Sequence, residues 1–313
     1  MYKAPDMSIW SGRDDALEGA AGSRWHQHIT SWSEGLPSGV SLLGFPCDQG
    51  VEINQGRVGA RHGPQAIRRS LAGQAWHLDK PIYDVGDIYC SDCDLESAQQ
   101  QLGDCVSRLL EEGQFPIVIG GGHEVAFGSW QGLFRFAQTQ PHMPLIGIIN
   151  LDAHFDLRAY ESHGSSGTPF KQIADQCDHQ QIPFHYACFG VAQGANTQAL
   201  FQRADALGVC YRTDEQMGVL QLDAIRQQLA NFMSICDWLY FTIDLDVLPA
   251  ANAPGVSAPA SRGVVLEVIE VLVEDIKASG KLKVADIAEL NPLLDIDQRT
   301  ARLAARLITQ IAR

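Results

Sequence analysis

Short apolar segments alternate with longer amphipathic segments from about residue 40 to the end of the chain. Short apolar segments bounded by glycine or proline are typical of strands buried in a parallel sheet, and the longer segments are typical of the connecting helices. The expected strands are residues 40–45, 116–119, 145–151, 184–191, 238–245 and 282–287. The expected helices are residues 95–112, 197–207, 222–234, 264–279 and 299–311. This order predicts an α/β fold, with a parallel sheet covered by helices on both faces.

The chain shows no internal repeat, low-complexity tract or obvious linker. We therefore expect residues 1–313 to form a single domain, with residues 1–35 as an N-terminal arm or surface extension. The formal net charge of −14 argues against a nucleic-acid partner, because no basic surface is available to neutralise phosphates. No apolar run is long enough to span a membrane, and the first thirty residues lack the order of a signal peptide. These features predict a cytoplasmic protein without a nucleic-acid or membrane partner, and its small-molecule substrate is inferred below from the site and the family resemblance.

Metal-ligand side chains follow two of the expected strands. Asp152, His154 and Asp156 end one strand, and Asp244 and Asp246 end another. Since alternate residues of a strand point to the same side, each group is expected to share one face. Carboxylates crowded in an apolar setting repel each other unless cations compensate them. Helix N-caps or surface loops would explain any one of these residues, but the five together predict a metal site.

A third polar segment, Gly-Gly-Gly-His-Glu at residues 120–124, lies where a strand gives way to a helix. Glycines there let the backbone approach a ligand closely. Neither the Lys-Ser/Thr pair nor the glycine spacing of a nucleotide-binding loop is present, so His123 is instead a candidate sixth metal ligand. Carboxylate and imidazole ligands without thiolate favour manganese or a similar divalent ion over structural zinc. Two ions about 3.5–4 Å apart can share a water and lower its pKa.

The motifs Gly-Gly-Gly-His-Glu, Asp-Ala-His-Phe-Asp, Asp-Leu-Asp and Glu-Leu-Asn-Pro at residues 289–292 occur in the same order as in the ureohydrolase family of arginase and agmatinase. With residues 56–69 included, the chain resembles that family over about residues 40–313. The resemblance implies a three-layer arginase-like fold with a central, mainly parallel sheet of about eight strands, usually assembled as a homo-oligomer.

The resemblance also implies two Mn²⁺ ions per subunit and a bridging hydroxide as the nucleophile. One ion would be held by His123, Asp152, Asp156 and Asp244. The other would be held by Asp152, His154, Asp244 and Asp246.

Four departures from the arginase pattern bear on the substrate. Phe170 stands where arginases carry a histidine thought to shuttle protons, and Arg158 replaces a small amide. Residues 190–196 contain no aspartate to bind an α-ammonium group, and residues 247–259 lack the Asp-Pro and Gly-Thr-Gly of other members. These departures resemble the branch of the family that hydrolyses N-formimidoyl-L-glutamate to L-glutamate and formamide, a step of histidine degradation.

This substrate carries its amidine on the α-nitrogen and has two carboxylates, so it offers no free α-ammonium. Arg158 is well placed to hold one carboxylate in a bidentate fork, although it is also a possible partner for the ligand carboxylates. Ser166 and Asn196 are candidate hydrogen-bonding groups around the glutamate portion. Arg57 and Arg61 are candidates for the other carboxylate, with surface or structural pairing as the alternative for each.

In the expected mechanism, Glu289 pairs with the amidinium and orients it, and Asp156 passes a proton to the leaving α-nitrogen. The nearest alternative is another ureohydrolase that acts on a guanidino acid and releases urea, as an arginase or guanidinobutyrase does. Agmatine has no carboxylate and would be repelled by Arg158. A single-zinc deacetylase of the same general architecture would leave Asp152, Asp156 and Asp246 unexplained. A non-enzymatic binding protein would show no turnover with manganese.

Overall fold

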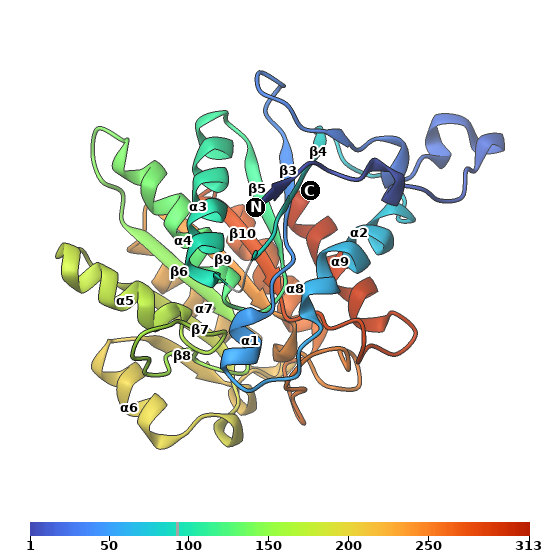
Figure 1. Ribbon diagram of the computed structural model, residues 1–313. Coiled ribbons are helices and arrows are strands. Elements are labelled where there is room, and N and C mark those ends of the chain that lie inside the picture. Colours follow the sequence, from blue (N-terminus) through green and yellow to red (C-terminus); the bar gives the residue numbers. More distant parts are fainter. Residues whose placement is uncertain (92–93) are drawn as a thin grey trace.

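The computed structural model describes residues 1–91 and 94–313, and a ten-stranded sheet forms its centre (Figure 1). The strand order is β1-β4-β3-β5-β10-β9-β6-β7-β8, and β2 also pairs with β4. Of these described pairings, only that of β1 with β4 is antiparallel. The strands are β1 (Tyr2–Lys3), β2 (Thr30–Ser31), β3 (Val40–Phe45), β4 (Ile82–Ile88), β5 (Phe115–Gly120), β6 (Ile146–Leu151), β7 (His185–Val191), β8 (Cys210–Thr213), β9 (Trp238–Asp244) and β10 (Leu282–Ala288).

Helices cover both faces of the sheet, which gives the predicted three layers (Figure 1). Alternate residues of β3 show how the two faces are filled: Leu42 belongs to one hydrophobic cluster and Leu43 to the other. Helices α3 to α6 pack in the cluster of Leu43, and α2 and α7 to α9 pack in that of Leu42. The helices are α1 (Gln49–Ile53), α2 (Gly63–Ala72), α3 (Leu95–Glu111), α4 (Val125–Gln138), α5 (Pro169–Gln180), α6 (Gln198–Ala206), α7 (Leu222–Ser234), α8 (Leu266–Ala278) and α9 (Arg299–Ala312).

The six expected strands and five expected helices are confirmed, each within two residues at either end. Strand β4 was not predicted from the sequence, because Asp84 and Asp87 interrupt its apolar pattern. Both carboxylates pair with the buried guanidinium of Arg68, at 2.9 Å and 2.6 Å. A buried charge that is paired and hydrogen-bonded can be tolerated inside a sheet. The strand therefore depends on a partner that lies in another element, α2.

The N-terminal segment, expected as an arm or surface extension, is attached to the outer edge of β4. Both β1 and β2 pair with that strand. Trp25 is fully buried, and the indole of Trp10 donates a hydrogen bond to Asp84 at 2.7 Å. Residues 1–35 therefore extend the sheet and cover one of its edges.

Strands β5, β10, β9 and β6 are neighbours in the middle of the sheet and run parallel. Their carboxyl ends therefore meet at one edge, which is where ligands bind in open parallel sheets. Among the described residues, no helix combines the length and apolar character needed to cross a membrane.

Candidate metal centre and active site

Each of the four central strands delivers polar side chains to the same edge. His123 follows β5, residues 152–156 follow β6, Asp244 ends β9 and Glu289 follows β10. The predicted position of His123, between a strand and a helix, is confirmed, because β5 ends at Gly120 and α4 begins at Val125. The turn between them needs glycine: a Cβ on Gly121 would lie 1.7 Å from the carbonyl oxygen of Cys47.

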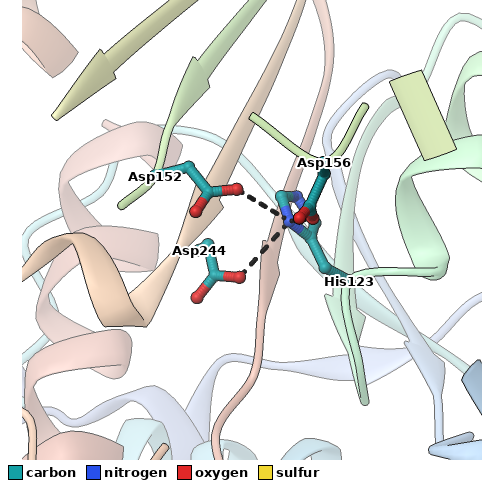
Figure 2. A group of neighbouring side chains, drawn as sticks. All are labelled: His123, Asp152, Asp156 and Asp244. Atoms are coloured by element: carbon teal, nitrogen blue, oxygen red, sulfur yellow. Dashed lines mark ion pairs between the residues drawn. The ribbon is translucent and has the colours of Figure 1, made fainter. Parts of the chain in front are cut away.

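Four of the predicted ligands form one compact group (Figure 2). The Nδ1 atom of His123 lies 3.1 Å from Asp152 Oδ2, 2.9 Å from Asp156 Oδ2 and 3.3 Å from Asp244 Oδ2. All four side chains are buried. The group matches the first ligand set that the family resemblance implied.

A second group shares Asp152 with the first. The Nδ1 atom of His154 lies 3.0 Å from Asp246 Oδ2 and 3.6 Å from Asp152 Oδ1. The three side chains present ligand atoms close enough to hold one ion. Two adjacent donor groups joined by a carboxylate are the arrangement that two bridged ions require.

The backbone reaches these positions differently from the sequence-based expectation. Strand β6 ends at Leu151, and Asp156 has a left-handed φ of 48°, so residues 152–156 form a loop and not an alternating strand. Asp246 likewise lies in a short 3₁₀ helix, in which Asp244 accepts a hydrogen bond from the Asp246 amide at 2.9 Å. The alternation argument was therefore wrong here, although the residues that it selected do lie together. Side chain–backbone bonds in the turns hold the ligands in place.

The electrostatics of the site fit divalent cations. Burial, followed by the charges of Asp246 and Asp152, raises the pKa of Asp244 well above its usual value. Burial and the charge of Asp152 raise the pKa of Asp156 to about 6. These two carboxylates lack enough positive charge around them, whereas the pKa of Asp152 is lowered because its contacts with His123 and His154 outweigh its burial.

The orientation of His123 also fits a metal ligand. Its Nε2 atom lies 3.0 Å from the hydroxyl of Thr242. Its Nδ1 atom faces three carboxylates and has no hydrogen-bond partner among the described residues. A cation among these atoms would satisfy all of them.

Glu289 lies beside the metal ligands in a strained conformation, with a φ of 71°. Its amide donates to the carbonyl of Gly121, and its Oε1 accepts from the amide of His123 at 2.8 Å. Burial, and then the charge of Glu124, raise the pKa of Glu289 to about 8. Its Oε2 atom has no hydrogen-bond partner among the described residues, and Glu289 lines the cavity.

A cavity of about 360 Å³ opens above these groups. Arg158 lines it, and its backbone amide donates to the carbonyl of Gly167 at 2.9 Å. Within the described ranges, the guanidinium of Arg158 forms no ion pair or hydrogen bond with the ligand carboxylates, which argues against the alternative role as their partner. Besides Arg158, the cavity is lined by Val51, Asn54, Gln55, Gly56, Arg57, His123, His154, Asp156, Ser166, Asp244, Asp246, Ser257, Ala258 and Glu289.

The other two predicted substrate contacts, Ser166 and Asn196, differ in their position relative to the cavity. Ser166 lines the cavity, whereas Asn196 does not. The amide nitrogen of Asn196 donates to the carbonyls of Ala153 and Ala192, and its oxygen accepts from the amide of Phe155. Both of its donor hydrogens are thus used by the backbone, so the expected hydrogen bond to substrate is replaced by a role in holding the ligand loop.

Phe170 is fully buried and packs edge-on against the ring of His123, with centroids 5.5 Å apart. It also stacks on Tyr186 at 4.4 Å. An apolar ring therefore occupies the position at which arginases were expected to carry a proton-shuttling histidine.

Sequence reasoning missed Asn54, Gln55 and Ser257 as cavity residues. Asn54 and Gln55 follow the five-residue helix α1, which was not predicted. Ser257 belongs to a segment without regular structure, noted from the sequence only for differing from other family members. The departure at residues 247–259 was the one available signal, and it could not show that this segment reaches the cavity.

The chain belongs to the arginase family, whose sequence model matches residues 38–312. It is 56% identical to a formimidoylglutamase of Aeromonas hydrophila, over 99% of this chain and 98% of the relative. It is 52% identical to a formimidoylglutamase of Ralstonia nicotianae, over 99% of this chain and 96% of the relative.

Solved structures agree on the fold. The formimidoylglutamase of Bacillus subtilis superimposes with a TM-score of 0.85 at 23% identity, over 96% of this chain and 93% of that one. The Trypanosoma cruzi formiminoglutamase with Mn²⁺ superimposes with a TM-score of 0.75 at 25% identity, over 99% of this chain and 98% of that one. The arginase-like fold expected from the sequence motifs is confirmed.

Proposed function

We propose that the protein hydrolyses N-formimidoyl-L-glutamate to L-glutamate and formamide, a step of histidine degradation. The observation that carries this proposal is the guanidinium of Arg158, which faces the cavity beside the metal-ligand groups without an acidic partner among the described residues. A substrate carboxylate would supply that partner. Relatives that are about half identical over nearly the whole chain carry the same activity in their names.

Two Mn²⁺ ions are the proposed cofactors. His123, Asp152, Asp156 and Asp244 would hold one, and Asp152, His154, Asp244 and Asp246 would hold the other. When bound, the ions would lower the pKa of water and supply hydroxide at neutral pH. Manganese is favoured over zinc because the donors are carboxylate and imidazole without thiolate, and because the T. cruzi relative contains Mn²⁺.

The residues of the cavity would bind the substrate, orient its amidinium and transfer a proton. Arg158 would hold one substrate carboxylate in a bidentate fork, and Ser166 would donate a hydrogen bond to the glutamate portion. The free Oε2 of Glu289 would accept a hydrogen bond from the amidinium and fix its orientation. Asp156, which lies among the metal ligands at the cavity, would pass a proton to the α-nitrogen as its bond to the formimidoyl carbon breaks. The products are then L-glutamate and formamide.

A product assay tests the proposal. The Mn²⁺-loaded protein is offered N-formimidoyl-L-glutamate, arginine, agmatine and 4-guanidinobutyrate side by side. Formamide and glutamate from the first substrate alone are the expected result. Urea from any of the other three would support the alternative of a guanidino-acid ureohydrolase and refute this assignment. A cytoplasmic location, expected from the sequence, and a homo-oligomeric state, implied by the family resemblance, are part of the same proposal.

A further inference from the structure

A second arginine lines the same cavity as Arg158. Arg57 lies on the loop after α1, whereas Arg158 follows the metal-ligand loop after β6. Among the described residues, neither guanidinium forms an ion pair with a carboxylate. Two unneutralised cations from separate elements therefore face one cavity.

The guanidinium of Arg57 is held by neutral groups. Its Nε donates to the carbonyl of Ser257 and its Nη2 to the carbonyl of Val256, both at 2.8 Å. Its backbone amide donates to the Ser257 hydroxyl oxygen at 2.8 Å. These contacts use the Nε–Nη2 edge, and both Nη1 hydrogens and one on Nη2 have no partner among the described residues. These hydrogens form the end-on fork that binds a carboxylate. The hydroxyl hydrogen of Ser257 also remains available as a donor.

The loop that carries Arg57 is fixed at several points. Asp48 accepts a hydrogen bond from the backbone amide of Gly59 at 2.7 Å. The side-chain amide of Asn291 donates to the carbonyls of Arg57 and Val58, both at 3.0 Å. A side chain held in this way before the ligand arrives loses little conformational entropy on binding.

Arg61, the other arginine considered for a second carboxylate, lies in a different setting. Its Nη2 and Nε are paired with the buried carboxylate of Asp48, each at 2.6 Å. It lines a separate cavity, together with Lys3 and Tyr89. The structure therefore separates the two candidates, and only Arg57 faces the metal-ligand groups.

We infer that Arg57, oriented by the carbonyls of Val256 and Ser257, binds the side-chain carboxylate of a dicarboxylic substrate and thereby sets specificity for the acidic side chain. This inference rests on the proposed function. Arg158 is two residues from the metal-ligand residue Asp156, so it is assigned to the α-carboxylate, next to the reacting nitrogen. Arg57 comes from the separate loop after α1, so it is assigned to the other carboxylate, on the substrate side chain.

The test compares two substrates that differ only in the distal group. N-formimidoyl-L-glutamate ends in a carboxylate, and N-formimidoyl-L-norvaline ends in a methyl group at the same place. For the glutamate substrate, Arg57→Met is expected to lower kcat/KM by about 10- to 100-fold, mainly through KM, as for loss of a charged hydrogen-bonded pair. For the norvaline substrate, the same variant should change kcat/KM by less than about threefold. The Mn²⁺ content should stay at the wild-type value.

Arg57→Lys and Arg61→Lys form a matched pair of milder variants. Lysine at 57 keeps the charge but loses the fork to the two carbonyls, so part of the loss on the glutamate substrate should appear. Lysine at 61 keeps the ion pair with Asp48 and should leave kcat/KM on both substrates near wild type. Inhibition by N-acetyl-L-glutamate and N-acetyl-L-norvaline gives the same comparison as a binding measurement.

An equal loss on both substrates, or no loss on the glutamate substrate, would overturn the assignment of Arg57 while leaving the proposed function intact. Failure of the wild-type protein to release formamide from N-formimidoyl-L-glutamate would instead refute the proposed function, and this inference with it.

Discussion

The floor and the rim of the cavity are held in place by different means. We use floor for the six proposed metal ligands, and rim for Asn54, Arg57, Arg158, Ser166 and Ser257. The floor lies at the ends of adjacent central strands, whose pairing fixes it. The rim is made of loops distant in sequence, such as the contact between Arg57 and Ser257, 200 residues apart. The comparison suggests that the floor determines the reaction and the rim selects the substrate.

Removal of divalent cations should have the largest effect, because it acts on the floor. After dialysis against a chelator, we expect hydrolysis of N-formimidoyl-L-glutamate to fall by on the order of 10³-fold or more. Added Mn²⁺ should restore the rate, and the melting temperature should rise with it, because a bound ion stabilises crowded carboxylates. Full activity in a preparation shown to be free of metal would contradict the metal centre.

Glu289→Gln should have the next largest effect. The glutamine carbonyl can still accept the hydrogen bond from the His123 amide, so the turn is expected to persist. The amidinium would lose its charged partner, and kcat/KM should fall by about 100- to 1,000-fold. Steady-state kinetics combined with metal analysis would check this. A variant that binds fewer ions would show that Glu289 supports the metal ligands instead.

Arg158→Met changes the rim and should leave the floor intact. We expect KM to rise by about 10- to 100-fold with little change in kcat, because the interaction is made with a carboxylate that does not react. Both metal ions should remain bound, as measured by metal analysis of the variant. Loss of metal would instead favour the role of Arg158 as a partner of the ligand carboxylates.

Asn196→Ala should have the smallest effect on substrate binding. Its amide bonds three backbone groups around the ligand loop, so the free energy of unfolding should fall by about 2–3 kcal/mol. At saturating Mn²⁺, KM should stay within about threefold of the wild-type value. Denaturant unfolding and steady-state kinetics measure the two quantities. A large rise in KM without loss of stability would restore the substrate role that the sequence suggested.

The floor could be predicted from the sequence because few features determine it. Asp152 and Asp244 follow apolar segments that any parallel sheet would bury, and parallel strands end at the same edge. The alternating-strand geometry predicted for the ligands was wrong, since Asp156 and Asp246 lie in turns and not in strands. The motifs selected residues that the structure brings together, although their local backbone geometry was predicted wrongly.

The rim could be predicted only in part, because its contacts are made between distant segments. Arg158 was identified because it stands where arginases carry a small amide, two residues beyond Asp156. The choice between Arg57 and Arg61 required knowing that Asp48 already pairs with Arg61. Asn196 was a candidate substrate contact, but nothing in the sequence showed that its side-chain amide donates hydrogen bonds to backbone carbonyls.

The pairing of residues 1–35 with β4 also has a consequence for self-association. An uncovered strand edge presents unpaired amides and carbonyls on which another chain can add a strand. Here the outer edge of β4 is occupied by the two-residue strands β1 and β2, which leave little length for such growth. A chain trimmed to the family's matched region, which starts at residue 38, would uncover this edge. The N-terminal segment thus occupies the part of the β4 edge on which another chain could otherwise add a strand.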